Sequence, residues 1–445
     1  MFNFDLSGKN KYYNLYCAIR GEILKGRIKP GERLPSKRAL AEELGVSVVT
    51  VQLAYEQLLA EGYISSRERS GYFVEDITAY SAHATQPSTF AYPTPPVESF
   101  KIDFVKGSTP ASLFPFATWA RLIRGVLADC GEHLLERVPC DGDFELKSAI
   151  SAYLYRARGI IVDPKYVIIG AGAEHLYGVI VQLLGRENIF AVENPGYGKI
   201  SSTYLLNGAK ILPISVKEAG ICLNEVEKSP ATVVHISPSH QFPTGAVMPA
   251  SARSRLISWA RAGNRYVIED DYDSEFRLVG KPLQCAFSLC PEKVIYMNTF
   301  SKSLAPSMRM GYTVLPPKLY EKYLQIFESS ANIVPLFEQK ALAAMLNGGY
   351  FERHLSRLKN HYRGVRGLLL EKLQNVCNVK DTGSGLHIIA EFPKAENDEE
   401  IKQKAAAEGI KLKCLSDYLI APASGYEKCA VINYSGVTRE QLLNV

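Results

Sequence analysis

The spacing of hydrophobic positions divides the first part of the chain into helical and strand-like segments. Three helical patterns and then two short β-like runs follow one another over Lys11–Lys25, Lys37–Leu44, Ser47–Glu61, Tyr63–Ile64 and Tyr72–Val74. Ser36 and Ser47 are suited to cap the second and third helices, and Gly45 to end the second. A helix, a helix-turn-helix and a two-stranded wing predict a winged helix-turn-helix domain over residues 1–75.

The hydrophobic pattern is lost between Glu75 and Ser99, where the chain is rich in Ala, Thr, Ser and Pro. This composition is typical of a semi-extended linker. So long a stretch without secondary structure is improbable inside one compact domain, and a domain boundary is therefore expected here. We predict a linker over residues 76–100.

Beyond Ile102, short apolar runs alternate with longer helical patterns. Examples of these runs are Val167–Ile169, Ile189–Val192, Ile211–Ile214, Val233–Ile236, Tyr266–Ile268 and Val294–Met297. Strands that alternate with helices predict βαβ units and a mostly parallel sheet with helices on both faces. Residues 101–445 are therefore predicted to form an α/β domain.

Composition and charge add limits to this picture. With 445 residues, the chain is long enough for two or three globular domains, and its formal charge of +5 is too small to establish a nucleic-acid partner. It has neither an apolar run long enough for a transmembrane helix nor the start of a secretion signal. The nine cysteines include no CxxC pair, which favours reduced thiols over disulfides or a zinc site. We expect a cytoplasmic protein without a metal or a membrane contact.

Four kinds of side chain follow the apolar runs in the order that a pyridoxal 5′-phosphate (PLP) site requires. Lys302 would hold the PLP aldehyde as an imine, because burial and neighbouring cations favour an uncharged amine. Asp270 would keep the pyridine nitrogen protonated, Tyr272 would bond to the ring oxygen, and Arg309 would bind the phosphate. Asp271 competes with Asp270, since strand alternation leaves open which carboxylate points inward.

The turn after Val167–Ile169 opens a helix, so its amides are placed to bind the same phosphate. Its Gly170-Ala171-Gly172 also resembles the start of a dinucleotide fingerprint, but His175 occupies the third glycine position. Tyr197 would stack on the cofactor ring. The further predicted phosphate ligands are Thr299, Ser301, Gly172, Ala173 and Glu174.

In a helix-turn-helix, the N-terminal side chains of the second helix of the motif face base edges in the major groove. The start of the preceding helix meets the phosphates, and the wing tip contacts the backbone or the minor groove. The side chains predicted to contact DNA in these three places are Ser47, Thr50 and Gln52; Ser36, Lys37 and Arg38; and Arg67, Arg69 and Gly71.

The N-terminal part resembles GntR-type regulators through Gly31–Ala41 and Gly45–Val51. Three further motifs, Pro238–Gly245, Glu269–Phe276 and Phe300–Pro306, resemble the MocR/GabR regulators. This resemblance implies a GntR-type domain joined by a linker to a fold-type I aminotransferase-like domain with a smaller C-terminal α/β subdomain. It also implies a homodimer, commonly head-to-tail and domain-swapped, that binds an operator in double-stranded DNA and senses a small-molecule effector.

Three positions depart from the family pattern. Val48 stands where GntR-type domains commonly have arginine. The strand-like run Cys429–Gly436 carries no arginine, although aminotransferases hold the substrate carboxylate with one on the equivalent strand. Lys199 falls where the GABA-sensing relative has an effector-binding arginine, and a lysine keeps the charge but loses the bidentate fork. The effector is therefore predicted to be PLP itself or an amino acid or amine.

The sequence thus favours a DNA-binding transcriptional regulator that depends on PLP. An active aminotransferase with an appended DNA-binding domain is the alternative, and the missing carboxylate arginine argues against efficient turnover. A regulator whose aminotransferase-like domain is a scaffold without cofactor is a third hypothesis, which the intact set of Lys302, Asp270 and Arg309 opposes.

Overall fold

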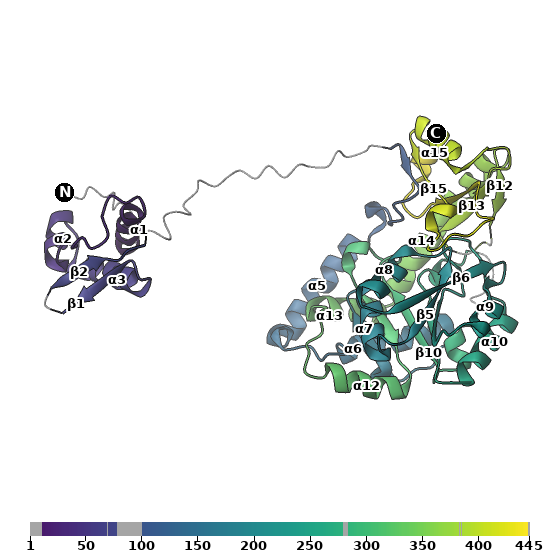
Figure 1. The fold of residues 1–445 in the computed structure, drawn as a ribbon, viewed down its shortest axis with the longest axis horizontal. Coiled ribbons are helices and arrows are strands. Elements are labelled where there is room, and N and C mark those ends of the chain that lie inside the picture. The colour runs from purple at the N-terminus through teal and green to yellow at the C-terminus, as the bar shows by residue number, and fades with distance from the viewer. Residues whose placement is uncertain are drawn as a thin grey trace. The chain divides into compact units, whose positions relative to one another are not determined.

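The computed structural model describes residues 11–68, 70–77, 100–278, 284–381, 383 and 385–443. The chain divides into two compact units, Met1–Val97 and Glu98–Val445 (Figure 1). Most of the predicted linker and the predicted DNA contact Arg69 lie outside the described residues. The domain bounds 1–75, 76–100 and 101–445 stay predictions.

The N-terminal unit is a winged helix-turn-helix, as predicted. Its elements are α1 (Lys11–Leu24), α2 (Lys37–Leu44), α3 (Val48–Ala60), β1 (Ile64–Arg67) and β2 (Gly71–Val74). Its own hydrophobic core includes Leu15, Ile19, Val51 and Leu58. The Ser36 hydroxyl accepts a hydrogen bond from the Ala39 amide at 3.2 Å, so this side chain caps α2.

The larger unit is built on an eight-stranded sheet with the strand order β4-β11-β10-β9-β8-β5-β6-β7. In chain order the strands are β4 (Val167–Gly170), β5 (Ile189–Asn194), β6 (Lys210–Lys217), β7 (Gly220–Ile221), β8 (Val233–Ile236), β9 (Tyr266–Asp270), β10 (Val294–Thr299) and β11 (Gly311–Val314). The five strands from β10 to β6 are parallel, while β11 and β7 pair antiparallel with their neighbours. The prediction of a mostly parallel sheet is confirmed.

Helices cover both faces of this sheet (Figure 1). They are α5 (Phe116–Cys130), α6 (Phe144–Arg158), α7 (Ala173–Leu184), α8 (Gly198–Leu206), α9 (Leu223–Lys228), α10 (Ala250–Arg261), α11 (Ala286–Leu289), α12 (Pro317–Phe327), α13 (Leu336–Asn347) and α14 (Tyr350–Leu373). Side chains alternate along each strand. Val267 therefore joins the core that contains α6 and α10, while Ile268 joins the core formed by α7, α8 and α12.

A smaller subdomain forms the C-terminal part of this unit (Figure 1). Its elements are β12 (Asn378–Lys380), β13 (His387–Glu391), α15 (Asp398–Ala407), β14 (Ile410–Lys411), β15 (Lys413–Cys414), β16 (Cys429–Asn433) and α16 (Arg439–Leu443). Four of the strands form a sheet in the order β12-β13-β16-β15. The short strand β3 (Ile102–Asp103), near the start of the unit, pairs in parallel with β14, so the beginning of the larger unit is held to its C-terminal subdomain.

Candidate functional site

Lys302 lies in the loop after β10, and its buried amine donates a hydrogen bond to the carbonyl oxygen of Gly107. The Thr109 hydroxyl donates to the Lys302 carbonyl oxygen at 2.9 Å and so fixes the loop. Burial lowers the pKa of the Lys302 amine, and the charge of Asp273 opposes that shift. Desolvation therefore favours the uncharged amine. The neighbouring charge that acts on the amine is the anion Asp273, whereas a cation was expected.

Asp270 and Asp271 lie on opposite sides of the sheet. The Asp270 Oδ2 atom accepts a hydrogen bond from the Tyr177 hydroxyl of α7 at 2.5 Å and lies 3.6 Å from His235 Nε2. Asp271 forms a buried ion pair of 2.8 Å with Arg158 of α6. Because successive strand residues face opposite sides, Asp270 shares the side of α7, where the predicted phosphate-binding turn lies.

Tyr272 follows Asp270 and Asp271; its side chain is partly buried, and its buried hydroxyl has no hydrogen-bond partner among the described residues. Burial, with the charges of Asp273 and Asp270, raises its pKa well above the ordinary value. Glu193 at the end of β5 is also buried, and burial raises its pKa to about 8. The surroundings of Tyr272 thus combine a buried phenolic hydroxyl with a carboxyl group that keeps its proton at neutral pH.

The start of α7 and Arg309 lie close together. Gly172 caps α7 with φ 82°, and a Cβ atom at this position would lie 3.3 Å from Arg309 Cζ. Glycine suits this position because the backbone is left-handed and the guanidinium approaches it closely. Thr299 ends β10, and Ser301 follows it in the Lys302 loop. The predicted phosphate ligands therefore come from α7, the loop after β10 and the stretch before β11.

Lys199, at the edge of the site, forms an ion pair with Glu174. Its Nζ atom lies 2.7 Å from Glu174 Oε1, which joins the first turns of α7 and α8. The hydrogen bond to Lys199 lowers the pKa of the Glu174 carboxyl, and the same bond raises the pKa of the lysine. An effector held by Lys199 would have to compete with Glu174. Tyr197, 42% exposed, lies beside Phe242 with a ring-centroid distance of 5.9 Å.

Several residues at the site were not predicted from the sequence. Tyr177 holds Asp270 but belongs to the apolar face of α7, which nothing in the sequence distinguishes from ordinary core. His235 Nε2 lies 3.6 Å from Asp270 Oδ2, and His235 Nδ1 lies 2.6 Å from the Tyr204 hydroxyl, within hydrogen-bond distance. A histidine inside the apolar run Val233–Ile236 was a usable signal. Gly107 contacts Lys302 from 195 residues away, and no local pattern indicates it.

Three buried side chains that could hold a metal ion come together in the larger unit. The ligand atoms of His240, Asp273 and His387 lie within 4.8 Å of one another. His240 Nδ1 is 3.1 Å from Asp273 Oδ2, and His387 Nε2 is 3.1 Å from the Pro243 carbonyl oxygen. Each histidine is therefore already engaged by a protein group.

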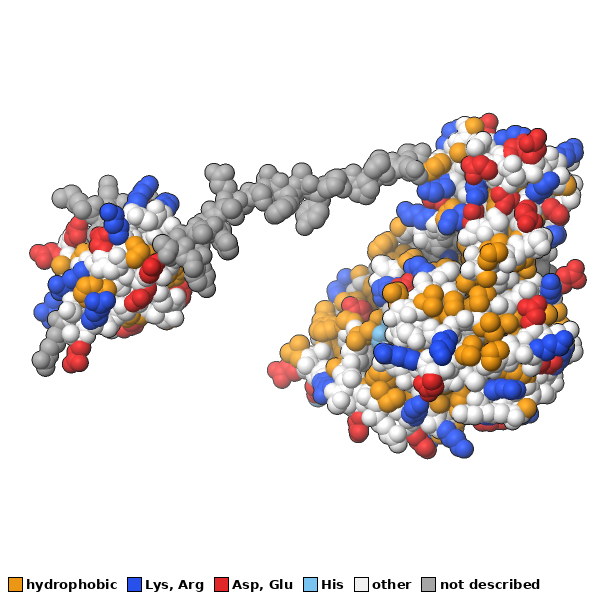
Figure 2. All heavy atoms as spheres, in the orientation of Figure 1, with side chains coloured by type: hydrophobic (Ala, Val, Ile, Leu, Met, Phe, Trp, Pro, Cys, Tyr) orange, Lys and Arg blue, Asp and Glu red, His pale blue; other side chains and the backbone are white. Residues whose placement is uncertain are grey.

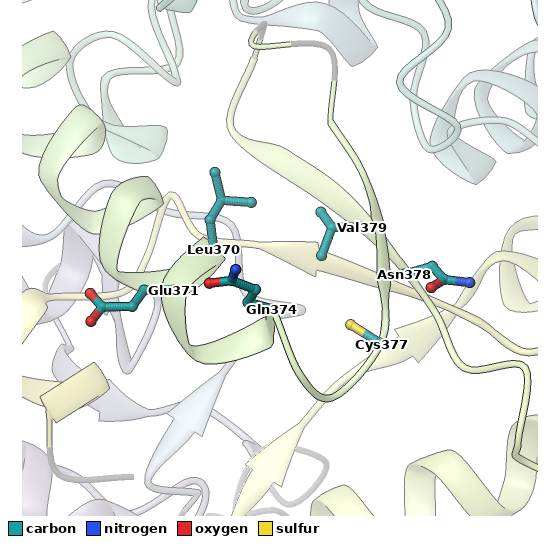
Figure 3. Close-up of a pocket in the computed structure, with 6 residues that line it drawn as sticks. All are labelled: Leu370, Glu371, Gln374, Cys377, Asn378 and Val379. Atoms are coloured by element: carbon teal, nitrogen blue, oxygen red, sulfur yellow. The ribbon is translucent and has the colours of Figure 1, made fainter.

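The last strand of the small subdomain brings an apolar surface to this region. β16 carries no arginine, and its Val431 packs in a cluster with Ile389 and Leu415, against which Phe242 and Tyr418 lie. The strand that was expected to supply a carboxylate-binding arginine thus supplies hydrophobic surface here. A separate pocket between α14 and β12, shown in Figure 3, contains none of the candidate site residues; its lining residues are Leu370, Glu371, Gln374, Cys377, Asn378 and Val379.

In the N-terminal unit the described residues among the predicted DNA contacts are exposed or partly exposed, and Figure 2 shows Lys and Arg side chains spread over the visible face. Arg38 is exposed near the start of α2, and Lys37 Nζ lies 5.9 Å from the centre of the Tyr72 ring. Arg67 Cζ stacks 4.5 Å from the centre of the Phe73 ring on the wing, opposite Gly71. The start of α2 and the wing therefore bring three cations to the surface of one small unit.

Sequence comparison identifies the class of the N-terminal unit. The family described as "Bacterial regulatory proteins, gntR family" matches residues 11–74. This is the span of the winged helix-turn-helix from α1 to β2.

Full-length relatives are similar over both units. The uncharacterized HTH-type transcriptional regulator YdeL of Bacillus subtilis (strain 168) is 35% identical over 438 residues, covering 97% of this chain and 94% of the relative. The probable rhizopine catabolism regulatory protein MocR of Rhizobium meliloti is 32% identical over 444 residues, with 95% and 90% covered. The pyridoxine biosynthesis transcriptional regulator PdxR of Corynebacterium glutamicum is 28% identical over 403 residues, with 90% and 87% covered.

Solved structures with a similar fold include aminotransferases. The α-aminoadipate aminotransferase LysN of Thermus thermophilus gives a TM-score of 0.67 at 24% identity, covering 77% of this chain and 89% of that protein. The kynurenine aminotransferase of Pyrococcus horikoshii gives 0.70 at 21% identity, with 78% and 89% covered. At these low identities, the similarity to the solved structures establishes the fold alone. A GntR-type helix-turn-helix joined to an aminotransferase fold defines a class of transcriptional regulators.

The chain belongs to the MocR-type family of helix-turn-helix transcriptional regulators. In the part of the chain that the structure describes, no helix is long and apolar enough to cross a membrane.

Proposed function

We propose that this regulator binds PLP covalently through Lys302 and binds operator DNA through its N-terminal unit. The observation that carries the cofactor proposal is the buried, desolvated Lys302 amine at the sheet edge where Asp270 and Tyr272 also lie. When bound, PLP supplies an aldehyde and an electron-withdrawing ring. Lys302 would supply the uncharged amine that holds this aldehyde.

The residues around Lys302 fit this cofactor. The Tyr272 hydroxyl is buried and lacks a partner among the described residues, so it is free to bond to the ring oxygen. Asp270, fixed by Tyr177, would accept a hydrogen bond from the protonated pyridine nitrogen. The α7 amides after Gly172, together with Arg309, would hold the phosphate at the N-terminal end of a helix, where negative charge is favoured.

The aminotransferase-like unit would act as the sensor and not as an efficient enzyme. β16 lacks a carboxylate-binding arginine, and Lys199 is paired with Glu174. We propose PLP itself, or an amino acid or amine that reacts with it, as the effector. Such a ligand changes DNA binding only if it binds two arrangements of the protein with different affinities.

We propose that the protein works as a cytoplasmic homodimer, in the head-to-tail, domain-swapped form that is common in its family. Helix α5 supports dimerisation, because Val126 is its only buried residue while Phe116 and Leu127 are 64% and 50% exposed. Exposed apolar surface of this kind is typical of interfaces. Sedimentation of the full-length protein at several concentrations measures the stoichiometry.

The first experiment is the visible absorption spectrum of the full-length protein and of Lys302→Ala, each with and without PLP. We expect a band from covalently bound PLP in the wild type and its absence in Lys302→Ala. Borohydride reduction followed by peptide mapping should place the PLP on Lys302. Lys199→Ala is the matched control and should retain the band.

The same samples can then be titrated with amino acids and amines while DNA binding is followed by fluorescence anisotropy. A spectral shift accompanied by a change in DNA affinity would identify an effector. If no covalent PLP forms at any concentration, the cofactor proposal is wrong. If an amino donor and a keto acid are converted over many cycles, the alternative of an active aminotransferase replaces the sensor proposal.

A further inference from the structure

The polar side chains that begin the recognition helix α3 are already hydrogen-bonded within the protein. The Ser47 hydroxyl accepts from the Thr50 amide at 3.1 Å and lies 2.8 Å from Thr50 Oγ1. The Gln52 side-chain amide donates to Glu56 Oε1 at 2.8 Å. The three residues that the sequence nominates for base contact in this helix therefore have partners before any DNA arrives.

Hydrophobic side chains are also exposed on this helix. Val48, Val49 and Leu53 are 43%, 64% and 44% exposed. At about 100° per residue, Val49 and Leu53 lie about 40° apart on the outward face of the helix, and Val48 lies at the border between that face and the buried side of Val51 and Tyr55. These three residues form what we term the apolar face of α3. Exposed β-branched and leucine side chains gain free energy when another apolar group covers them.

The neighbours of this helix indicate a polyanion as the occupant of its surface. The buried Tyr55 hydroxyl donates to the Pro35 carbonyl oxygen at 2.9 Å, which ties α3 to the start of α2. The Tyr55 ring packs at 4.9 Å on Tyr72 of the wing, and Lys37 lies over that ring. Lys37 of α2 is thus joined to α3 through this aromatic contact, and Arg67 lies on the same wing. An apolar protein partner would leave these charges uncompensated, whereas DNA phosphates would pair with them.

We propose that Val48, Val49 and Leu53 recognise the C5-methyl groups of thymines in the major groove. The other groups on the major-groove edges are hydrogen-bond donors and acceptors, which an apolar side chain cannot satisfy. Only the thymine methyl gains from contact with valine or leucine. The operator is therefore read in part by apolar contact. This inference rests on the proposed DNA binding and adds the feature of the bases that is recognised.

The test uses the full-length protein with added PLP and duplexes that it selects from a random-sequence pool. Each thymine of a selected duplex is replaced in turn by deoxyuridine, which lacks only the methyl group. We expect an affinity loss of about fourfold at the contacted thymines, the amount for one buried methyl group. Val49→Ser removes both γ-methyl groups of the side chain and leaves a hydroxyl. In Val49→Ser, deoxyuridine should no longer cost affinity at the thymine that Val49 contacts.

Ala60→Ser, at the far exposed end of α3, is the matched control and should leave both the affinity and the response to deoxyuridine unchanged. Tight binding that tolerates deoxyuridine at every position would overturn this inference and leave the DNA-binding proposal intact. Failure to retain any duplex at low salt would overturn both.

Discussion

The two candidate sites of this regulator are built in opposite ways. Around Lys302, polar groups are buried, and neighbouring helices hold them in place, as Tyr177 holds Asp270 and Arg158 holds Asp271. On the recognition helix, the polar groups are satisfied locally and hydrophobic side chains face outward. Changes in the buried site should therefore affect folding and cofactor binding strongly. Changes on the DNA-facing surface should change the affinity for DNA only slightly.

The largest effect is expected from Arg158→Met, which leaves the Asp271 carboxylate buried without its cation. Removing one partner of a buried ion pair costs about 3–5 kcal/mol of unfolding free energy. Urea unfolding followed by tryptophan fluorescence measures it, because both tryptophans, Trp119 and Trp259, lie in the larger unit.

The matched control lies two residues earlier on the same helix. Arg156 pairs with Glu352 at 2.8 Å, with side-chain exposures of 49% and 38%. Arg156→Met should cost no more than about 1 kcal/mol. Equal losses in the two variants would contradict the contrast between buried and exposed charge.

The second prediction concerns the dependence of stability on pH. Glu193 has a pKa of about 8 in the folded protein because it is buried, against an ordinary value of 4.5. Folding stability from this group is fully present below pH 4.5 and is lost as the pH rises to about 8, because only the folded state bears the cost of a buried charge.

Glu193→Gln removes the titration but keeps an oxygen that can accept from the Gln241 amide. The unfolding free energy of the variant should therefore fall less between those pH values than that of the wild type, by on the order of 4 kcal/mol. Fluorescence-detected urea unfolding at a series of pH values provides the comparison. Parallel curves for the two proteins would show that Glu193 does not titrate in this range.

A smaller effect is expected when the support of Asp270 is removed. Tyr177→Phe deletes the hydroxyl that bonds to Asp270 and should weaken PLP binding by about tenfold, the value of one hydrogen bond to a charged group. A spectroscopic PLP titration gives the affinity. Tyr323→Phe removes a hydroxyl bonded to the Cys140 carbonyl oxygen instead, and it should leave PLP affinity unchanged.

The smallest change is predicted at the DNA surface. Arg38→Gln should weaken binding to all duplexes alike and reduce the slope of log affinity against log salt by about 0.9, the amount for one lost phosphate contact. Anisotropy titrations at several salt concentrations measure the slope. Lys25→Gln removes an exposed cation just after α1, away from the predicted DNA contacts, so its slope should equal that of the wild type.

The sequence predicted the winged helix-turn-helix and the α/β sheet because both depend on local hydrophobic spacing. It also predicted that Lys302, Asp270, Tyr272 and Arg309 belong to one cofactor site, because strand ends in a parallel sheet meet at one edge. The roles of Asp270 and Asp271 stayed open, since the choice depends on which side of β9 each residue faces.

Other features depend on long-range packing and leave no local pattern. Gly107 reaches Lys302 because β3 pairs with β14, and this pairing has no counterpart in the spacing of nearby residues. Tyr177 looks like any core residue of an apolar helix. On α3, the sequence pointed to Ser47 and Gln52, and only the hydrogen bonds of the folded helix show that these groups are already engaged.

The pairing of β3 with β14 has a mechanical consequence. Lys101 and Phe104 donate backbone hydrogen bonds to Gly409 and Lys411 at 2.8 and 2.9 Å, and a few residues later the chain reaches the Lys302 amine at Gly107. A pull on the chain at Phe100 meets this short two-stranded clamp first and the lysine contact next. The lysine contact therefore bears the load only after the hydrogen bonds of the two-stranded clamp have broken.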